Sequence, residues 1–322
     1  TLGFYTIPWD ARAGAWPQLA FLARALAEGD SPFWAPGVFA GHPQIADPQS
    51  LIFSPPFLLL AWLAPKANFQ MADATVFAML ALAGLAIILF FRDRGWRAEG
   101  ALVAAFAFSF GGSNAWRLQH IGEVLSLCWF AIALFFWSRA LERRSLLWGL
   151  GAGVTAGFMV LGRDQIAMLC AWLLVLFTLW RIVGWSLLAN LRAAVKPALA
   201  GVVGGLAVAA VPLAFSIALA MQSNRPSIDF AGAAKGSMSP LAALTAVVAN
   251  LYGVDGPMSD FWGPPSSLVW GENDFVLARN MGAIYFGALP LAALICVGLA
   301  RDRKSTRLNS SHIPLSRMPS SA

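Results

Sequence analysis

The chain has 322 residues, of which 58% are hydrophobic and 12% are charged, whereas soluble domains carry about 45–50% apolar and about 25% charged residues. This shortage of ionic side chains argues against a soluble enzyme, a disordered chain or a disulfide scaffold, and it indicates a polytopic membrane protein. The formal net charge of +6 comes partly from a C-terminal segment that we expect to be foreign to the protein.

Residues 1–71 are expected to form a first loop on the outer side of the membrane. The chain begins at Thr1, at a point that reads as a loop following a first helix that is not part of the sequence. Residues 17–28 have a Leu/Phe face bordered by charged side chains, and residues 51–64 are too short and too proline-broken to cross a bilayer. Both segments are predicted to be helices lying at the membrane interface.

Seven apolar stretches are long enough, or nearly long enough, to cross about 30 Å of hydrocarbon. They lie at residues 72–91, 100–114, 121–138, 146–161, 166–183, 198–221 and 281–300. The second and fourth are short, which favours helices that end at a cavity rather than at lipid headgroups. The cysteines fall in apolar runs and are expected to act as small hydrophobes; they are Cys128, Cys170 and Cys296.

The loops between these stretches differ in their content of basic residues, which predicts their orientation. One set is rich in arginine and is predicted to be cytoplasmic; it holds Arg92, Arg94, Arg97, Arg139, Arg143, Arg144, Arg181, Arg192, Lys196 and Arg301. The opposite set is predicted to face outward. The expected organisation is an outer loop at 1–71, a core of six spans at 72–221, a long outer loop at 222–280 and a last span at 281–301.

Residues 302–322 are expected to be a non-native tail. The run DRKSTRLNSSH resembles the translation of a common sequencing adapter, and SRMPSSA resembles its next constant part. Without this segment, Lys+Arg falls from 22 to 18 and Asp+Glu from 16 to 15, so most of the positive excess disappears. We therefore expect the natural sequence to be truncated at about Arg301.

The first outer loop carries three candidate functional residues. Asp10 is either a general base or the N-cap of the helix that follows it. Asp47 precedes Pro48 and either belongs to a site or initiates a turn. His42 is a candidate ligand of an acceptor or metal, with a structural role as the alternative. The tryptophans of this loop are either part of a site or interfacial anchors.

Later outer segments add further candidates. Arg117, His120 and Glu123 are spaced for roughly one helical face if their segment is helical, and a histidine and a carboxylate entering a membrane are costly unless they face a cavity. The turn at Arg163 and Asp164 joins two spans and is either part of a site or an interfacial ion pair.

The long outer loop at 222–280 offers two cations for a donor phosphate and several aromatic rings for stacking on sugars, although simple packing explains the aromatics equally well. The cations are Arg225 and Lys235, and the rings are Tyr252, Trp262 and Trp270.

Several motifs together resemble the GT-C superfamily of polytopic glycosyltransferases, and within it the bacterial YfhO-like membrane proteins. After Asp10 come a G-x-x-PFW-x-P segment at residues 29–36, a G-x-P-Q-x-A-D-P-Q-S turn at residues 41–50 and an SPP-led helix. Later the chain reads FGGSNAWRLQH, GRDQ and YFGALPLAAL. The likeness covers essentially residues 1–301, and the first helix and C-terminal part of the family are not matched.

The resemblance implies an all-α transmembrane bundle of GT-C type, with interfacial helices and a site on the outer face of a bacterial inner membrane. It implies transfer of a sugar from a polyprenyl-phosphate donor to an envelope glycan or lipid acceptor. Asp10 is then the catalytic base, because the acceptor hydroxyl loses a proton as it attacks. Arg117 and Arg163 are the expected phosphate partners, since arginine binds phosphate oxygens bidentately.

Two other functions stay open from the sequence. A transporter or flippase needs polar residues along the whole crossing, whereas the ionisable residues here gather at one side and no inverted repeat is visible. A non-catalytic membrane assembly protein with the same fold is the second alternative. No cofactor is indicated, no spacing defines a metal site, and nothing points to nucleic acid as a partner.

Overall fold

The computed structural model confirms the expected all-α fold. It describes residues 6–8, 10–162, 164–183, 187–223, 229–230, 239–253, 262–263, 284–285, 287–288 and 290–297. Of these residues 74% are helical, and none belongs to a strand.

The helices are as follows. A π-helical turn at Ala11–Ala15 leads into α1 (Trp16–Glu28), after which come α2 (Pro55–Leu63), α3 (Phe69–Asp93), α4 (Ala98–Phe110), α5 (Gly112–Arg117), α6 (Ile121–Arg143), α7 (Leu146–Val160), α8 (Gln165–Ile182) and α9 (Leu187–Met221). A 3₁₀ turn at Pro240–Ala246 and a helical stretch at residues 290–297 complete the described part.

Four of the described helices, α3, α6, α8 and α9, are long and apolar enough to cross a membrane. They fall on four of the seven predicted spans. The helices α4 and α7 are apolar but shorter, as the sequence predicts for 100–114 and 146–161, and whether they cross stays a prediction. Of the last predicted span, at 281–300, only part lies within the described residues.

The helix α9 begins eleven residues before the span predicted at 198–221. The predicted span begins just after Pro197, and a proline removes a backbone hydrogen bond and usually breaks a helix. In the structure the helix continues through Pro197, which is fully buried. Its burial against α7 provides the packing that offsets the missing hydrogen bond.

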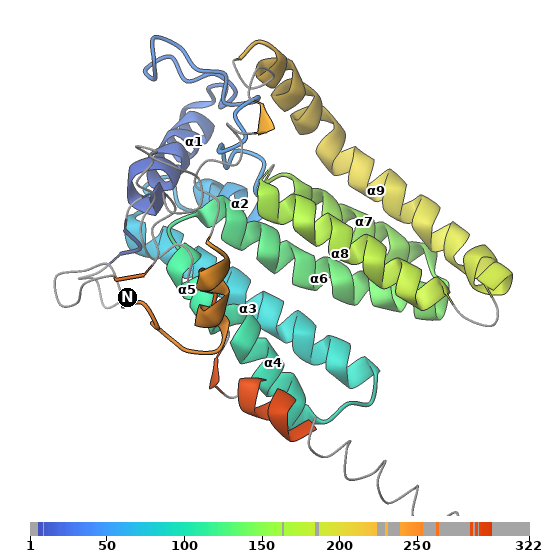
Figure 1. The fold of residues 1–322 in the computed structure, drawn as a ribbon. Helices are drawn as coiled ribbons and strands as arrows, with labels where there is room; N and C mark the ends of the chain where they lie inside the picture. Colours follow the sequence, from blue (N-terminus) through green and yellow to red (C-terminus); the bar gives the residue numbers. More distant parts are fainter. Residues whose placement is uncertain are drawn as a thin grey trace, which may run out of the picture.

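The helices are arranged in a row with α3 and α6 at its centre (Figure 1). The helix α4 packs on one side of α3 and α6 on the other, α7 packs on α6, and α9 packs on α7, while α8 lies mainly against α6. At the end of the bundle where α3 and α6 begin, α1 and α2 pack on each other and α5 leads into α6. We call this the site end of the bundle.

The helices α1 and α2 share one hydrophobic core with α3 and α6. Its most deeply buried members include Leu19 of α1, Phe57 of α2, Val76 of α3 and Val124 of α6. Arg24 and Glu28 of α1 are exposed, and whether this helix lies at the membrane interface stays a prediction. The first loop is therefore packed onto the long helices rather than suspended above them.

Glycines bring α7 and α9 into backbone contact. A Cβ on Gly149 would meet the carbonyl oxygen of Pro197, and one on Gly153 would meet the carbonyl oxygen of Gly201. Gly149, Gly153 and Gly157 recur every four residues, so they lie along one face of α7. Small residues at this spacing allow helices in membranes to pack by close backbone approach.

The outward faces of α8 and α9 are apolar and exposed. On α8 they carry large side chains such as Trp172, Leu176 and Trp180, and on α9 Val203 and Leu206. Water-soluble monomers rarely expose continuous apolar surface of this extent. Such a surface fits contact with lipid hydrocarbon.

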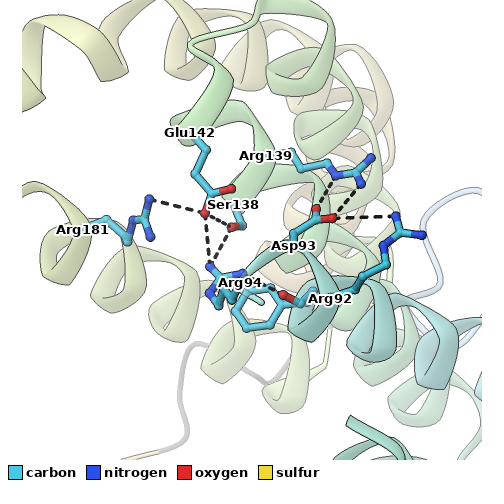
Figure 2. Close-up of polar contacts among 8 residues, drawn as sticks. Arg92, Asp93, Arg94, Ser138, Arg139, Glu142 and Arg181 are labelled. Carbon is cyan, nitrogen blue, oxygen red and sulfur yellow. Dashed lines mark hydrogen bonds and ion pairs between the residues drawn. The ribbon is translucent and has the colours of Figure 1, made fainter. Parts of the chain in front are cut away.

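The opposite end of the bundle, where α3 and α6 end, carries a network of arginines and carboxylates (Figure 2). Arg139 of α6 donates two hydrogen bonds to Asp93 of α3, at 2.5 and 2.9 Å, and Arg92 lies 3.7 Å from the same carboxylate. The Arg139 guanidinium also lies 4.5 and 4.6 Å from the ring centres of Phe135 and Trp148. This pair connects the ends of α3 and α6.

A second part of the network centres on Glu142 of α6. Arg94 and Arg181 lie 3.7 and 3.4 Å from its carboxylate, and Arg94 also donates a 2.7 Å hydrogen bond to Ser138. Burial lowers the pKa of Arg94, while the charge of Glu142 acts in the opposite direction. We call the two parts together the arginine end; its basic residues belong to the loops predicted to be cytoplasmic.

Candidate functional site

Asp10 lies at the site end, at the start of the π-helical turn that precedes α1. It occupies the N-cap position, yet its side chain makes no capping hydrogen bond. The side chain is 69% exposed, and its Oδ2 atom lies 3.2 Å from Nδ1 of His120. The structure therefore does not support the capping alternative and leaves the carboxylate available for chemistry.

His120 sits in a break between two helices. The sequence places Arg117, His120 and Glu123 on one face if the segment is a single helix, but α5 ends at Arg117 and α6 starts at Ile121. His120 itself is non-helical, with φ −94° and ψ 74°. The imidazole therefore contacts Asp10 from a non-helical residue between α5 and α6, and the predicted single helical face is not formed.

His120 contacts polar groups through both ring nitrogens. The side-chain amide nitrogen of Gln119 lies 3.3 Å from Nε2 of His120, and Oδ2 of Asp10 lies 3.2 Å from Nδ1. The imidazole therefore lies between an amide and one oxygen of the carboxylate.

Arg117 and Glu123 form an ion pair beside this contact. Nη1 of Arg117 lies 2.9 Å from Oε2 of Glu123, and the two side chains are 35% and 27% exposed. Because a guanidinium has five N–H donors, the pair leaves Arg117 with donors for a phosphate oxygen. The break between α5 and α6 brings these two residues together across six positions of sequence.

Asp73 is a further residue of this region, and it is absent from the candidates that the sequence predicts. It is 3% exposed in the first turns of α3, and its Oδ2 accepts hydrogen bonds from the hydroxyl of Thr6 at 2.8 Å and the backbone N–H of Ile7 at 3.0 Å. It therefore fixes the segment that leads to Asp10. The sequence could have identified Asp73, because a carboxylate within an apolar span usually faces the protein interior.

Asp164 has a structural role at the start of α8. Its carboxylate caps α8 by accepting from the N–H of Ala167 at 2.6 Å, and it accepts from the hydroxyl of Ser126 at 2.7 Å. Both oxygens are therefore engaged, one as an N-cap and one in a link between α6 and the start of α8. Arg163, the other residue of the ion pair predicted at this turn, lies outside the described residues.

A small hollow of about 30 Å³ lies between the turn after Pro48, the first turns of α6 and the end of α7. Ser54 and Ser126 are among its lining residues, and the buried hydroxyl oxygen of Ser54 has no hydrogen-bond partner among the described residues. Gly122, also in the lining, is two residues from His120. The hollow is therefore lined by polar groups close to the break between α5 and α6, where His120 lies.

His42 and Asp47 pair within the first loop. Nε2 of His42 lies 3.1 Å from Oδ2 of Asp47, while Oδ1 of Asp47 accepts from the backbone N–H of Gln49 at 2.9 Å. The second contact is the Asx turn that the sequence offered as an alternative for Asp47. The two residues stabilise the turn around Pro48 and are not in hydrogen-bond contact with Asp10.

The candidates in the long outer loop are described only in part. Arg225, Lys235 and Trp270 lie outside the described residues. Tyr252 and Trp262 pack edge to face with ring centres 5.2 Å apart, and the Tyr252 hydroxyl donates to the carbonyl of Leu241 at 2.9 Å. These contacts fit the packing alternative for the two rings.

Within the described part of the chain, no group of three or more His, Cys, Asp or Glu side chains is arranged to hold a metal ion. Comparison of the chain with protein-family models, with curated proteins and with solved structures finds no match.

Proposed function

We propose that the chain is an integral membrane glycosyltransferase of GT-C type that transfers a sugar from a polyprenyl-phosphate donor to a cell-envelope acceptor. The observation that carries the proposal is the arrangement of Asp10, an exposed carboxylate that caps no helix and lies 3.2 Å from Nδ1 of His120. A carboxylate positioned in this way is suited to accept a proton from a hydroxyl group.

The chemistry assigned to these residues is a single displacement at the anomeric carbon. The acceptor oxygen forms a bond to that carbon as its proton passes to Asp10, and the bond from carbon to the phosphate oxygen breaks with its electrons. The polyprenyl phosphate leaves with added negative charge, which the remaining donors of Arg117 are suited to bind. Arg163, Arg225 and Lys235 stay candidate phosphate partners from the sequence.

Two features support a site on the outer face of the membrane. His120 precedes α6, whereas Arg139 and Glu142 lie near the far end of the same helix. A helix of 23 residues is about 34 Å long, close to the thickness of the hydrocarbon. The arginine end then faces the cytoplasm by the positive-inside rule, and the site end faces outward.

The test is the glycan composition of the cell envelope in bacteria that carry this gene. Envelope glycans are measured by mass spectrometry in the wild type, a deletion strain, and strains expressing Asp10→Asn or Asp30→Asn at matched protein levels. Asp30 is the matched control, because it is an exposed carboxylate just after α1. Deletion and Asp10→Asn should lose the same sugar, and Asp30→Asn should retain it.

Other results redirect the assignment. If deletion changes the glycans but Asp10→Asn does not, Asp10 is not the base. If neither changes them, the glycosyltransferase proposal fails and the transporter and assembly alternatives take its place.

A further inference from the structure

The first loop contains an aromatic hairpin at residues 33–42 that is closed by backbone hydrogen bonds. The N–H of Ala35 donates to the carbonyl of His42 at 2.8 Å, and the N–H of His42 donates back at 3.0 Å. The contact of His42 with Asp47, 3.1 Å from Nε2 to Oδ2, holds the base of the hairpin against the following turn. The hairpin is therefore a preformed element and not an irregular connection.

The tip of the hairpin adopts an unfavourable backbone conformation. Phe39 and Ala40 have φ values of 50° and 61°, in the left-handed region that non-glycine residues rarely adopt. Gly41 follows with φ 125°, and a Cβ there would meet the ring of Trp34. Strain of this kind persists where the surroundings enforce it and often marks a functional element.

This conformation presents apolar side chains to the exterior. The side chain of Phe39 is 90% exposed, and Phe33, Trp34 and Val38 are exposed as well. No charged residue occurs between positions 31 and 41. A rigid tip of this composition is costly in water but suits a hydrocarbon environment.

The position of the hairpin indicates which apolar environment it meets. The turn that follows it is joined to α9, because the hydroxyl of Ser216 donates to the carbonyl of Ala46 at 2.9 Å. Figure 1 shows this part of the first loop beside the end of α9. Phe215, Ile217 and Met221 are exposed on that end of α9, so the hairpin adjoins a surface that fits lipid contact.

We propose that the tip of the aromatic hairpin inserts into the lipid leaflet at the site end of the bundle. Phe39 and Val38 enter the boundary between headgroups and acyl chains, and Trp34 lies at the level of the headgroups, where tryptophan is favoured. The hairpin then anchors the first loop to the membrane surface independently of any reaction that the site performs.

The test is fluorescence quenching by spin-labelled lipid. Phe39→Cys is prepared in a Cys296→Ala background, because Cys128 and Cys170 are buried while Cys296 is exposed. The single site is labelled with the fluorophore NBD, and the full chain is reconstituted into phosphatidylcholine–phosphatidylglycerol vesicles with and without 5-doxyl phosphatidylcholine. Asp30→Cys, at an exposed position before the hairpin, is the control.

The label at position 39 should be quenched at least about twofold more strongly than the label at position 30, because interfacial apolar groups reach about 5–10 Å into the headgroup–acyl boundary. Its emission should also shift to the blue in vesicles. Equal quenching at the two positions would overturn the proposal. A blue shift without lipid quenching would also overturn it, since the tip then contacts protein, such as a second copy of the chain.

The adjacent variant Val38→Cys guards against a local effect of losing the Phe39 ring. It should reproduce the strong quenching if the tip inserts as a unit, and quenching at the level of position 30 in both tip variants contradicts insertion.

Discussion

The ion pair between Arg139 and Asp93 should make a measurable contribution to the stability of the bundle. The two side chains are 14% and 15% exposed and are joined by two hydrogen bonds. Exposed pairs contribute about 0–1 kcal/mol, whereas removing one partner of a fully buried pair costs about 3–5 kcal/mol. The pair lies at a helix end, between these limits, so we expect Asp93→Ala to lower the free energy of unfolding by about 2–3 kcal/mol.

The single substitutions should differ in a way that the surroundings predict. Asp93→Ala leaves the Arg139 guanidinium without its carboxylate, although the rings of Phe135 and Trp148 stay in contact. Arg139→Ala leaves Asp93 with a second cation, Arg92, at 3.7 Å. The free energy of unfolding should therefore fall less through uncompensated charge than in Asp93→Ala. The coupling energy from the double-mutant cycle should be about 2 kcal/mol.

The measurement is unfolding in mixed micelles of dodecyl maltoside and sodium dodecyl sulfate, followed by circular dichroism. The matched control is the pair of Arg97 and Glu99, which is 3.4 Å apart with side chains 88% and 74% exposed and should show no measurable coupling. A coupling between Asp93 and Arg139 no larger than that of the control pair would refute the argument from burial.

Three further results are expected from the structure. Gly153→Leu should destabilise the protein by about 1–3 kcal/mol through overpacking between α7 and α9. Gly100→Leu, where an added Cβ would have only one neighbour, a ring carbon of Phe91 at 3.8 Å, should not lower the unfolding midpoint. Asp73→Ala should increase hydrogen exchange at the backbone amide of Ile7, which loses its acceptor together with the Thr6 hydroxyl. Asp73→Asn, which keeps an acceptor oxygen, should restore protection, and equal exchange in both variants would contradict the anchoring role. Asp164→Ala should cost about 1 kcal/mol through loss of the α8 cap, and an unchanged unfolding midpoint would show that this cap is not needed.

The positions of the long helices were predictable from the sequence because burial in hydrocarbon requires unbroken apolar runs. α3, α6 and α8 match the predicted stretches to within a few residues at most ends. The start of α9 was not predictable in this way. Whether a helix continues through Pro197 depends on the neighbour against which the proline packs, and that neighbour, α7, lies far away in sequence.

The candidate site was predictable in its residues but not in its arrangement. Asp10, Arg117, His120 and Glu123 were recognisable as ionisable groups beside apolar stretches. The contact between Asp10 and His120 depends on the break before α6 and on the anchoring of the first segment by Asp73. These are tertiary features, and hydropathy carries no information about them.

The length of α9 has a consequence for the membrane around the protein. With 35 residues, it is about 52 Å long at 1.5 Å per residue, well beyond a hydrocarbon thickness of about 30 Å. The first turns of α9 carry Arg192 and Lys196, so its apolar part is the predicted span at 198–221, about 36 Å long. The excess over the hydrocarbon thickness is relieved by tilt or by local thickening of the bilayer. The glycine contacts with α7 fix the angle at which α9 can lean, so the match between helix and bilayer is set by packing. The protein should therefore prefer bilayers of a defined thickness.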